Sequence, residues 1–433
     1  MSSLIIEGGK KLHGTIENQP SKNAAEAILF ACVMIRGKVT LVNVPELEGV
    51  HQILKLLKSI GVEVRQEKRT IHLDASAKLH LDNIDREASE ATRTSLLLLG
   101  ALAAREKNYT LYRSGGCHLG ERTVRPHLYA LKKLGVAAAC EEGCYKVRNE
   151  KLQAAGIVLY ESGDTTTENV IMAAVLAPGV TTIKMASANY MVQDLCYFLN
   201  KAGANIEGIG TTTLTIKGAA ELNPVEEYPI MPDPIVAMTL LSIAITTGSG
   251  FTVKNCPLEF LELELCKLEV MGQVYHLKNK RMSENGKFIV VDIEVVPSKL
   301  TALPDKIYGR PFPGLNIDNL PLFIPILTQA AGRTMVHDWA YENRAVYGLD
   351  LQKLGATVTL LDPHRLWVEG RTTFTPAEAD APPGIRPAVN LLICMLAAKG
   401  RSVLHHSDII ERGYEKGFFL GLGRAGAKIE LVN

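Results

Sequence analysis

A helix-and-strand pattern recurs six times along this 433-residue chain, at a spacing of roughly seventy residues. The first part of the pattern is an apolar helix followed by a strand. It is predicted at 25–42, 95–112, 170–184, 236–253, 322–336 and 391–404. A fixed period is typical of proteins built from copies of one supersecondary unit. The period therefore predicts a repeat architecture instead of an ordinary doubly wound sheet.

The second part of the pattern is an amphipathic helix that ends at a glycine, after which a strand begins. The glycines are Gly61, Gly135, Gly203, Gly272, Gly355 and Gly426. A glycine just past a helix end commonly takes the left-handed conformation that terminates the helix. Because both markers recur in all six copies, we predict a mixed α/β chain of six related repeats.

Composition and charge narrow the class of protein. With 47% hydrophobic, 21% charged and 6% aromatic residues, the chain has the composition of a packed globular protein. Its net charge of +1 provides no overall attraction to nucleic acid or membrane. The longest apolar runs are far too short to span a bilayer, and residues 1–4 do not resemble a signal peptide. We expect a cytoplasmic protein without nucleic-acid or membrane partners.

Metal and dinucleotide motifs are weak. The eight cysteines are scattered, and the closest pair, Cys140 and Cys144, lacks the second pair that a zinc site needs. His405 and His406 have no third ligand at metal spacing, which favours a structural role. Residues 421–426 match G-x-G-x-x-G but fall inside a predicted helix close to the end of the chain. We therefore expect no metal site and no dinucleotide site.

The six repeats divide into three plus three, and the length suits two domains. Pro229, Pro232 and Pro234 mark a rigid crossover between the halves. Strands expected at 4–7 and 11–14 precede the first repeat and can pair back with the second half. We therefore expect one domain at 20–231 and another formed by 1–19 plus 232–433. Two chain crossings would join them, with the active site in a cleft between the domains.

The longest interval between marker glycines, from Gly272 to Gly355, contains a loop rich in proline and glycine at 308–319. Long loops in compact domains are often functional. Asp318 closes this loop just before the fifth apolar helix. From its position alone, a plain helix N-cap is a fair interpretation of this residue.

A second loop, 114–122, places three glycines around Cys117 and ends at Arg122. Glycines make a loop of low bulk, and an arginine beside a thiol lowers the thiol pKa or binds an anion. The alternative interpretation, a buried structural cysteine, stays open because free cysteine is among the most buried residue types.

Basic residues recur at the edges of the repeats. Lys22 and Asn23 begin the first long helix, where free backbone N–H groups favour phosphate. Arg93, Arg344, Arg386 and Arg412 stand at helix starts or in loops, and we expect their guanidinium groups to be free. Each one alone is more simply a solvated surface residue. Together they suit a ligand that carries both a phosphate and a carboxylate.

These residues resemble the enolpyruvyl transferases of the MurA type and, less closely, their shikimate-pathway relatives. The resemblance covers the whole chain and rests on Ser-Lys-Asn-Ala-Ala at 21–25, Gly-Gly-Cys-x-x-Gly-x-Arg at 115–122, Glu-Asn-Arg at 342–344 and Arg-Gly-Tyr-Glu at 412–415. The cysteine loop separates the MurA type from the shikimate type. The resemblance implies two inverse α/β barrel domains, each made of three βαβαββ repeats.

The resemblance also implies a reaction without metal or organic cofactor. Phosphoenolpyruvate gives its enolpyruvyl group to the 3′-hydroxyl of UDP-N-acetylglucosamine through a tetrahedral ketal, the first step of peptidoglycan precursor synthesis, and phosphate leaves. By this resemblance Cys117 protonates the methylene carbon and Asp318 takes the hydroxyl proton. Asn23 contacts the acceptor. The basic set around the phosphate and carboxylate is Lys22, Arg93, Arg122, Arg344, Arg386 and Arg412, of which Lys22 and Arg412 are the candidates for a catalytic role.

Three segments depart from the MurA pattern, at 123–127, 163–167 and 189–191, and all fall on the acceptor side. Arg125 stands where the family has an acid. These departures leave open a second hypothesis, a paralogue that acts on another uridine nucleotide such as UMP in nucleoside-antibiotic synthesis. A third hypothesis, from a different class, is a non-catalytic repeat protein that binds an anionic ligand. The oligomeric state is not predicted.

Overall fold

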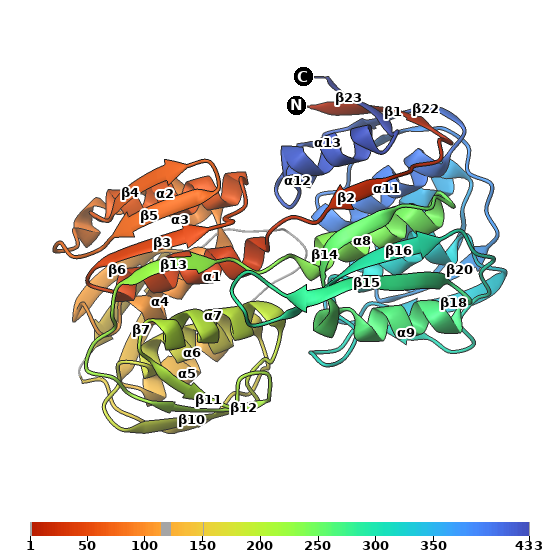
Figure 1. Cartoon of the computed structure of the whole chain (residues 1–433). Coiled ribbons are helices and arrows are strands. Elements are labelled where there is room, and N and C mark those ends of the chain that lie inside the picture. Colours follow the sequence, from red (N-terminus) through yellow and green to blue (C-terminus); the bar gives the residue numbers. More distant parts are fainter. Residues whose placement is uncertain (1, 114–122, 150, 433) are drawn as a thin grey trace. The chain divides into compact units, whose positions relative to one another are not determined.

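The computed structural model describes residues 2–113, 123–149 and 151–432 (Figure 1). These residues form two compact units. We call the described residues of the range 20–231 the first unit, and those of 2–19 with 232–432 the second unit. The chain thus passes from the second unit to the first after Gln19 and returns at Pro232.

Each unit contains three repeats, and each repeat begins with an apolar core helix. The core helices are α1 (Lys22–Ala31), α4 (Leu98–Ala101), α6 (Asp164–Ala174), α8 (Pro234–Thr246), α10 (Phe323–Leu327) and α11 (Ile385–Ala397). All thirteen residues of α8 are buried, as expected for a helix that is apolar all round. Two core helices are shorter than the pattern predicts. Residues Arg93–Leu97 and Leu320–Leu322 form the 3₁₀ helices η3 and η5 ahead of α4 and α10.

The second helix of each repeat is amphipathic in sequence. These helices are α2 (Glu48–Ser59), α5 (Arg125–Lys133), α7 (Tyr190–Lys201), α9 (Glu262–Val270), η6 (Arg344–Leu354) and α13 (Lys416–Arg424). All six marker glycines take positive φ, between 87° and 107°, which confirms the predicted terminations. The fifth differs from expectation because η6 is a 3₁₀ helix, not an α-helix. The remaining short helices are η1 (Cys32–Met34), η2 (Leu81–Asn83), α3 (Arg86–Ala91), η4 (Leu258–Phe260) and α12 (Asp408–Glu411).

Each repeat contributes one antiparallel sheet, and in the first five repeats the last strand of the repeat lies in the middle of its three antiparallel strands. In the first unit the sheets contain β3 (Lys38–Val42), β5 (Thr70–Asp74) and β4 (Glu63–Glu67); β6 (Asn108–Tyr112), β8 (Cys144–Asn149) and β7 (Val136–Glu141); β10 (Val180–Lys184), β12 (Thr213–Lys217) and β11 (Asn205–Glu207). In the second unit they contain β14 (Thr252–Pro257), β16 (Ile289–Val296) and β15 (Val274–Met282); β18 (Gly332–His337), β20 (Arg365–Gly370) and β19 (Thr357–Asp362); β22 (Gly400–His405), β1 (Ser3–Gly8) and β23 (Lys428–Val432).

The N-terminal strand completes the last repeat. β1 pairs antiparallel with both β22 and β23 and takes the central place that β5 holds in the first repeat (Figure 1). The prediction that this segment pairs back with the second half is confirmed. The strand expected at 11–14 begins later, because β2 spans Thr15–Glu17.

Five of the sheets gain a short parallel edge strand. β9 (Gly156–Val158), β17 (Ile307–Tyr308) and β21 (Glu378–Asp380) each pair within their own repeat. At the two crossings the edge strands are exchanged: β2 pairs with β14, and β13 (Val225–Pro229) pairs with β3. The sheets cover buried helices in each unit, which is the arrangement of an inverse α/β barrel made of three βαβαββ repeats.

Among the described residues, no helix is both long enough and apolar enough to cross a bilayer.

Candidate active site

The N-terminus of α1 places two of the predicted residues. Ser21 caps the helix, since its hydroxyl accepts a hydrogen bond from the Ala24 N–H at 3.2 Å. Lys22 follows as the first helical residue, and its ammonium lies 3.3 Å from Oε1 of Glu26 one turn later. The other oxygen of that carboxylate accepts a hydrogen bond from the Thr94 hydroxyl at 3.0 Å. The segment that carries Lys22 is therefore bonded to the segment that carries Arg93.

Arg93 begins η3 and is half-buried. The neighbouring His127 is 2% exposed and contacts the Asn169 amide at 3.0 Å. Burial, and secondarily the charge of Arg93, lowers the His127 pKa to about 3. A neutral imidazole therefore lies near the guanidinium and adds no second positive charge beside it.

Hydrogen bonds join two of the segments that depart from the MurA pattern. Asp164, at the start of α6, accepts a hydrogen bond from the Ser187 hydroxyl at 2.6 Å and one from the Asn189 amide at 3.3 Å. The next residue, Tyr190, is fully buried, and its hydroxyl accepts a hydrogen bond from the Asn23 amide at 2.9 Å. The structure thus connects Asn23 with the departures at 163–167 and 189–191. Arg125, from the third departing segment, is exposed at the start of α5.

In the second unit, Asp318 is held by Arg344. Nη1 of Arg344 lies 3.2 Å from Oδ1 of Asp318, and Nη2 donates to the Ile317 carbonyl at 2.5 Å. A quarter of the Asp318 side chain, 27%, stays exposed. Asp318 is not a helix N-cap, because η5 begins at Leu320 with Asn319 at the cap position. The carboxylate is therefore oriented by an arginine and still reachable from solvent.

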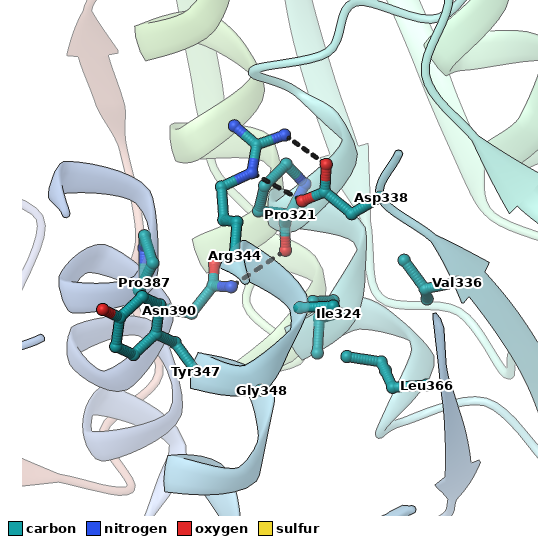
Figure 2. A pocket seen from close by; sticks show the side chains of 11 residues that line it. Pro321, Ile324, Val336, Asp338, Arg344, Tyr347, Gly348, Leu366, Pro387 and Asn390 are labelled. Atoms are coloured by element: carbon teal, nitrogen blue, oxygen red, sulfur yellow. Dashed lines mark hydrogen bonds and ion pairs between the residues drawn. The ribbon is translucent and has the colours of Figure 1, made fainter. Parts of the chain in front are cut away.

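The guanidinium of Arg344 is not free, contrary to our expectation from the sequence. Its side chain is 2% exposed and forms a two-pronged ion pair with Asp338, shown by dashed lines in Figure 2. The ring of Tyr341 lies 4.0 Å from the guanidinium carbon. Burial opposes the charged form, but the Asp338 carboxylate raises the Arg344 pKa. Arg344 therefore stays charged inside the protein.

A small pocket adjoins this ion pair. Asp338 and Arg344 line it together with Ile324, Tyr347 and Asn390 (Figure 2). The Asn390 amide donates to the Pro321 carbonyl at 3.0 Å and so ties α11 to η5.

The loop around Asp318 is also anchored from α9. Glu264 is 2% exposed, and its Oε1 accepts hydrogen bonds from the Asn319 amide at 2.8 Å and from the Asn316 N–H at 3.4 Å. Burial raises the Glu264 pKa to about 7, although the hydrogen bond from Asn319 opposes this. Asp318 thus lies in the sequence between Asn316 and Asn319, and the buried Glu264 carboxyl group holds the backbone of the first and the side chain of the second.

Arg386 and Arg412 are linked through the motif at 412–415. Arg386 donates to the hydroxyl of the buried Tyr414 at 2.7 Å, and that hydroxyl is also 2.7 Å from the Thr239 hydroxyl. Arg412 is exposed directly after α12. Gln19 brackets the motif: its amide donates to the Gly413 carbonyl at 3.0 Å and accepts from the Glu415 N–H at 3.1 Å.

The predicted residues thus fall into two clusters. Lys22, Asn23 and Arg93 belong to the first unit, whereas Asp318, Arg344, Arg386 and Arg412 belong to the second. Cys117 and Arg122 lie outside the described residues. Sequence reasoning missed the side chains that hold these groups, namely Gln19, Glu26, Glu264, Asp338 and Tyr414. Only Tyr414 lies in a quoted motif, and nothing in the local pattern identifies the other four.

His405 has structural contacts, as the sequence favoured. One ring nitrogen lies 3.0 Å from the Ser3 hydroxyl and the other 2.7 Å from Glu378. These contacts join β22 to its neighbouring strands.

Comparison with known proteins identifies the family. The sequence model described as EPSP synthase (3-phosphoshikimate 1-carboxyvinyltransferase) matches residues 6–419. The UDP-N-acetylglucosamine 1-carboxyvinyltransferase of Desulfovibrio desulfuricans is 33% identical over 96% of both chains. The protein of the same name from Borreliella burgdorferi is 32% identical over 100% of this chain and 99% of its own.

Solved structures share the fold. The enolpyruvyl transferase NikO from Streptomyces tendae matches with a TM-score of 0.85 and 21% identity, over 100% of this chain and 99% of its own. EPSP synthase from Acinetobacter baumannii matches with a TM-score of 0.78 and 18% identity over the whole of both chains. Together with the family model and the full-length relatives, these findings show that the chain belongs to the EPSP synthase family of enolpyruvyl transferases, with relatives of the MurA type.

Proposed function

We propose that this transferase moves the carboxyvinyl group of phosphoenolpyruvate to the 3′-hydroxyl of UDP-N-acetylglucosamine and releases phosphate. The observation that carries the proposal is the second-unit cluster, in which Asp318 is oriented by the buried Arg344 while 27% of its side chain stays exposed. Relatives that span almost the whole chain bear the name of this activity. In this proposal, residues of both units serve one reaction.

The chemistry needs one base, one acid and several cations. Asp318 takes the proton of the acceptor hydroxyl as that oxygen attacks C2 of phosphoenolpyruvate. Cys117 delivers a proton to C3, and the resulting ketal then loses phosphate from C2 and a proton from C3, which restores the double bond. A positioned acid or base of this kind typically increases the reaction rate by a factor of about 10²–10⁴. Lys22, Arg93, Arg122, Arg386 and Arg412 hold the phosphate and carboxylate, where charge develops during the reaction.

Arg344 has a different place in this proposal. Its guanidinium donates to Asp338, to Asp318 and to the Ile317 carbonyl, and it is almost fully buried. We assign Arg344 to hold the proposed base, Asp318. Any contact of Arg344 with the substrate would be made by the guanidinium nitrogen nearest Asp318. This assignment is consistent with its position in the Glu-Asn-Arg motif.

A second candidate acceptor is another uridine nucleotide, such as UMP. The observation that favours it is the bonded network on the acceptor side. There Asn23 is engaged by Tyr190, and Asp164 joins Ser187 to Asn189. These hydrogen bonds involve residues that differ from the MurA pattern, which supports an acceptor shaped differently from the sugar nucleotide.

One assay separates these hypotheses. Phosphate release from phosphoenolpyruvate is measured with UDP-N-acetylglucosamine, UMP, UDP and shikimate 3-phosphate as acceptors. Turnover with the sugar nucleotide supports the main proposal, and turnover with UMP alone supports the alternative. If no acceptor gives phosphate release, and phosphoenolpyruvate still binds, the protein is the non-catalytic anion binder.

The role of Cys117 has its own test. Fosfomycin, an epoxide that alkylates the matching cysteine in this family, should add one adduct that mass spectrometry detects. Cys117→Asp should abolish the adduct yet keep turnover, because a carboxylic acid still delivers a proton. The exposed cysteines Cys140 and Cys266 serve as internal controls for unspecific labelling. An adduct on either of them, with none on Cys117, would remove the thiol from the mechanism.

A further inference from the structure

Glu26 is a buried acid in the middle of the first core helix. It is 2% exposed, although α1 is otherwise rich in alanine and other apolar residues. A buried carboxylate is costly unless it is paired. Its two oxygens are divided between two partners: Oε1 lies 3.3 Å from the Lys22 ammonium, and Oε2 accepts from the Thr94 hydroxyl at 3.0 Å.

The position and order of the Lys22–Glu26 pair are unfavourable for the stability of helix α1. A lysine in the first turn opposes the helix dipole, and a lysine that precedes its glutamate by four residues is the weaker order for such a pair. The lysine side chain is 25% exposed, whereas that of its partner is 3% exposed. One side of the ammonium is therefore anchored in the protein while another side faces solvent.

The second partner of Glu26 connects a different repeat. Thr94 follows Arg93, and its N–H donates to the Thr92 hydroxyl at 3.3 Å. The two threonine hydroxyls are 2.7 Å apart. A shift of the Glu26 carboxylate would therefore move both Lys22 and the turn that carries Arg93.

The surroundings leave room for this pair. Gly49 of α2 faces it, and a Cβ at that position would lie 3.1 Å from Oε1 of Glu26 and 3.6 Å from Cε of Lys22. Nearby Glu168 is 2% exposed, and its Oε1 has no hydrogen-bond partner among the described residues. Burial, aided by the charges of Asp164 and Glu26, raises the Glu168 pKa well above its ordinary value. The raised pKa favours the protonated form of the Glu168 carboxyl group.

We propose that Glu26 is a positioning residue that holds the Lys22 ammonium and the Arg93 turn in one fixed arrangement for an anionic substrate. The inference rests on the proposed function, because it takes phosphoenolpyruvate as the anion. Glu26 acts through Lys22 and Arg93 and does not itself touch the substrate.

The test uses the full-length protein and the variant Glu26→Gln, which keeps the side-chain shape and an acceptor for Thr94. We expect kcat to fall about tenfold, because correct orientation of a charged group is worth at least that much. The KM for phosphoenolpyruvate should not rise, because Lys22 and Arg93 keep their positive charges in this variant. Glu90→Gln is the matched control: Glu90 forms an exposed pair with Arg86 at the same spacing, and both constants should stay unchanged.

Two further variants separate positioning from mere folding. Thr94→Val should lower kcat, and Thr94→Ser should restore it, while the melting temperature of Thr94→Ser stays that of the wild type. Unchanged kcat in Glu26→Gln would overturn the proposal. So would a rise in KM that accompanies a lower melting temperature, since that pattern indicates a structural role.

Binding distinguishes this inference from the proposed function. Calorimetry with phosphoenolpyruvate alone is run on Glu26→Gln, Lys22→Met and the double variant. If Glu26 acts through Lys22 and Arg93, its replacement changes the affinity more in the wild type than in the Lys22→Met background, where only the effect through Arg93 remains. If Glu26→Gln changes the affinity for phosphoenolpyruvate equally in both backgrounds, the inference is wrong. If the wild type binds phosphoenolpyruvate without turnover, only the proposed function is wrong.

Discussion

Two nitrogens of the Arg344 guanidinium donate hydrogen bonds to the Asp338 carboxylate. Nε lies 2.5 Å from Oδ2, and Nη2 lies 2.9 Å from Oδ1. The opposite edge of the same guanidinium reaches Asp318 at 3.2 Å. Both partners of the two-pronged pair are buried, since their side chains are 2% and 6% exposed. The position of the proposed base therefore depends on a second, buried carboxylate.

Asp338→Asn tests this dependence. The variant leaves the Arg344 charge buried with one of its acceptors replaced by a donor, and breaking such a pair costs about 3–5 kcal/mol. We expect the unfolding free energy of the second unit to fall by that amount and kcat to fall with it. Both tryptophans, Trp339 and Trp367, lie in this unit, so denaturation followed by fluorescence reports its unfolding. Asp350→Asn, which breaks the more exposed pair with Lys353, should cost less than about 1 kcal/mol. Equal costs for the two variants would contradict the role of Asp338.

Glu264 should make the second unit less stable as pH rises. Its pKa is about 7 in the folded protein against an ordinary 4.5, so between these values only the folded state keeps the proton. Unfolding then releases a proton, and the unfolding free energy falls by up to about 1.4 kcal/mol per pH unit. Below pH 4.5 and above pH 7 the two states bind the same number of protons at this group.

Glu264→Gln removes that dependence while its amide oxygen still accepts from Asn319. The difference in unfolding free energy between variant and wild type should grow in favour of the variant from pH 4.5 to 7 and then level off. Tryptophan fluorescence again follows the second unit. Parallel stability curves for the two proteins would show that the Glu264 carboxyl does not titrate in this window.

Gln19→Ala should affect both stability and substrate affinity. It removes the partners of the buried Gly413 carbonyl and Glu415 N–H, and each unsatisfied group costs about 1–3 kcal/mol. Because the loop that carries Arg412 and Tyr414 loosens, the KM for phosphoenolpyruvate should rise several-fold. Gln329→Ala is the control, since Gln329 bonds Thr328 and the Thr372 carbonyl in the same unit. It should lower stability and leave KM unchanged; a rise in KM there would mean that the effect of Gln19 is not local.

Two helix-terminating glycines of the first unit should differ in their tolerance of alanine. Gly61 and Gly135 have φ of 94° and 89°, so both variants carry the backbone penalty of a left-handed residue, about 1 kcal/mol. A Cβ at Gly61 meets the movable ring of His80 at 3.2 Å, whereas one at Gly135 meets the Lys151 carbonyl at 2.2 Å. Gly135→Ala should therefore be the more destabilising, measured by circular dichroism during thermal unfolding. The reverse order would contradict the packing at Gly135.

Much of the fold follows from local pattern. The six glycines that end the second helices are recognisable because only glycine takes positive φ at little cost, and all six do so. Helix type is less predictable. Prolines 321 and 325 lack the N–H that one continuous α-helix would need here, and the segment is divided into the short helices η5 and α10.

The candidate site divides in the same way. Lys22, Cys117, Asp318 and the arginines stand in short motifs that can be recognised in the chain. The side chains that orient them cannot, because Glu26 meets Thr94 and Glu264 meets Asn319 across long separations in sequence. Arg344 illustrates the difference, since the motif identifies the residue but does not reveal that it is buried.

By itself, the amino-acid order determined the repeat, its helix ends and the family, because these depend on apolar period, backbone preference and contiguous motifs. Only the tertiary structure decided that β1 lies between β22 and β23, and which carboxylate pairs with which cationic side chain. Strand insertion and buried ion pairing depend on the three-dimensional packing of distant segments, where the loss of solvent makes each unpaired charge or backbone group costly.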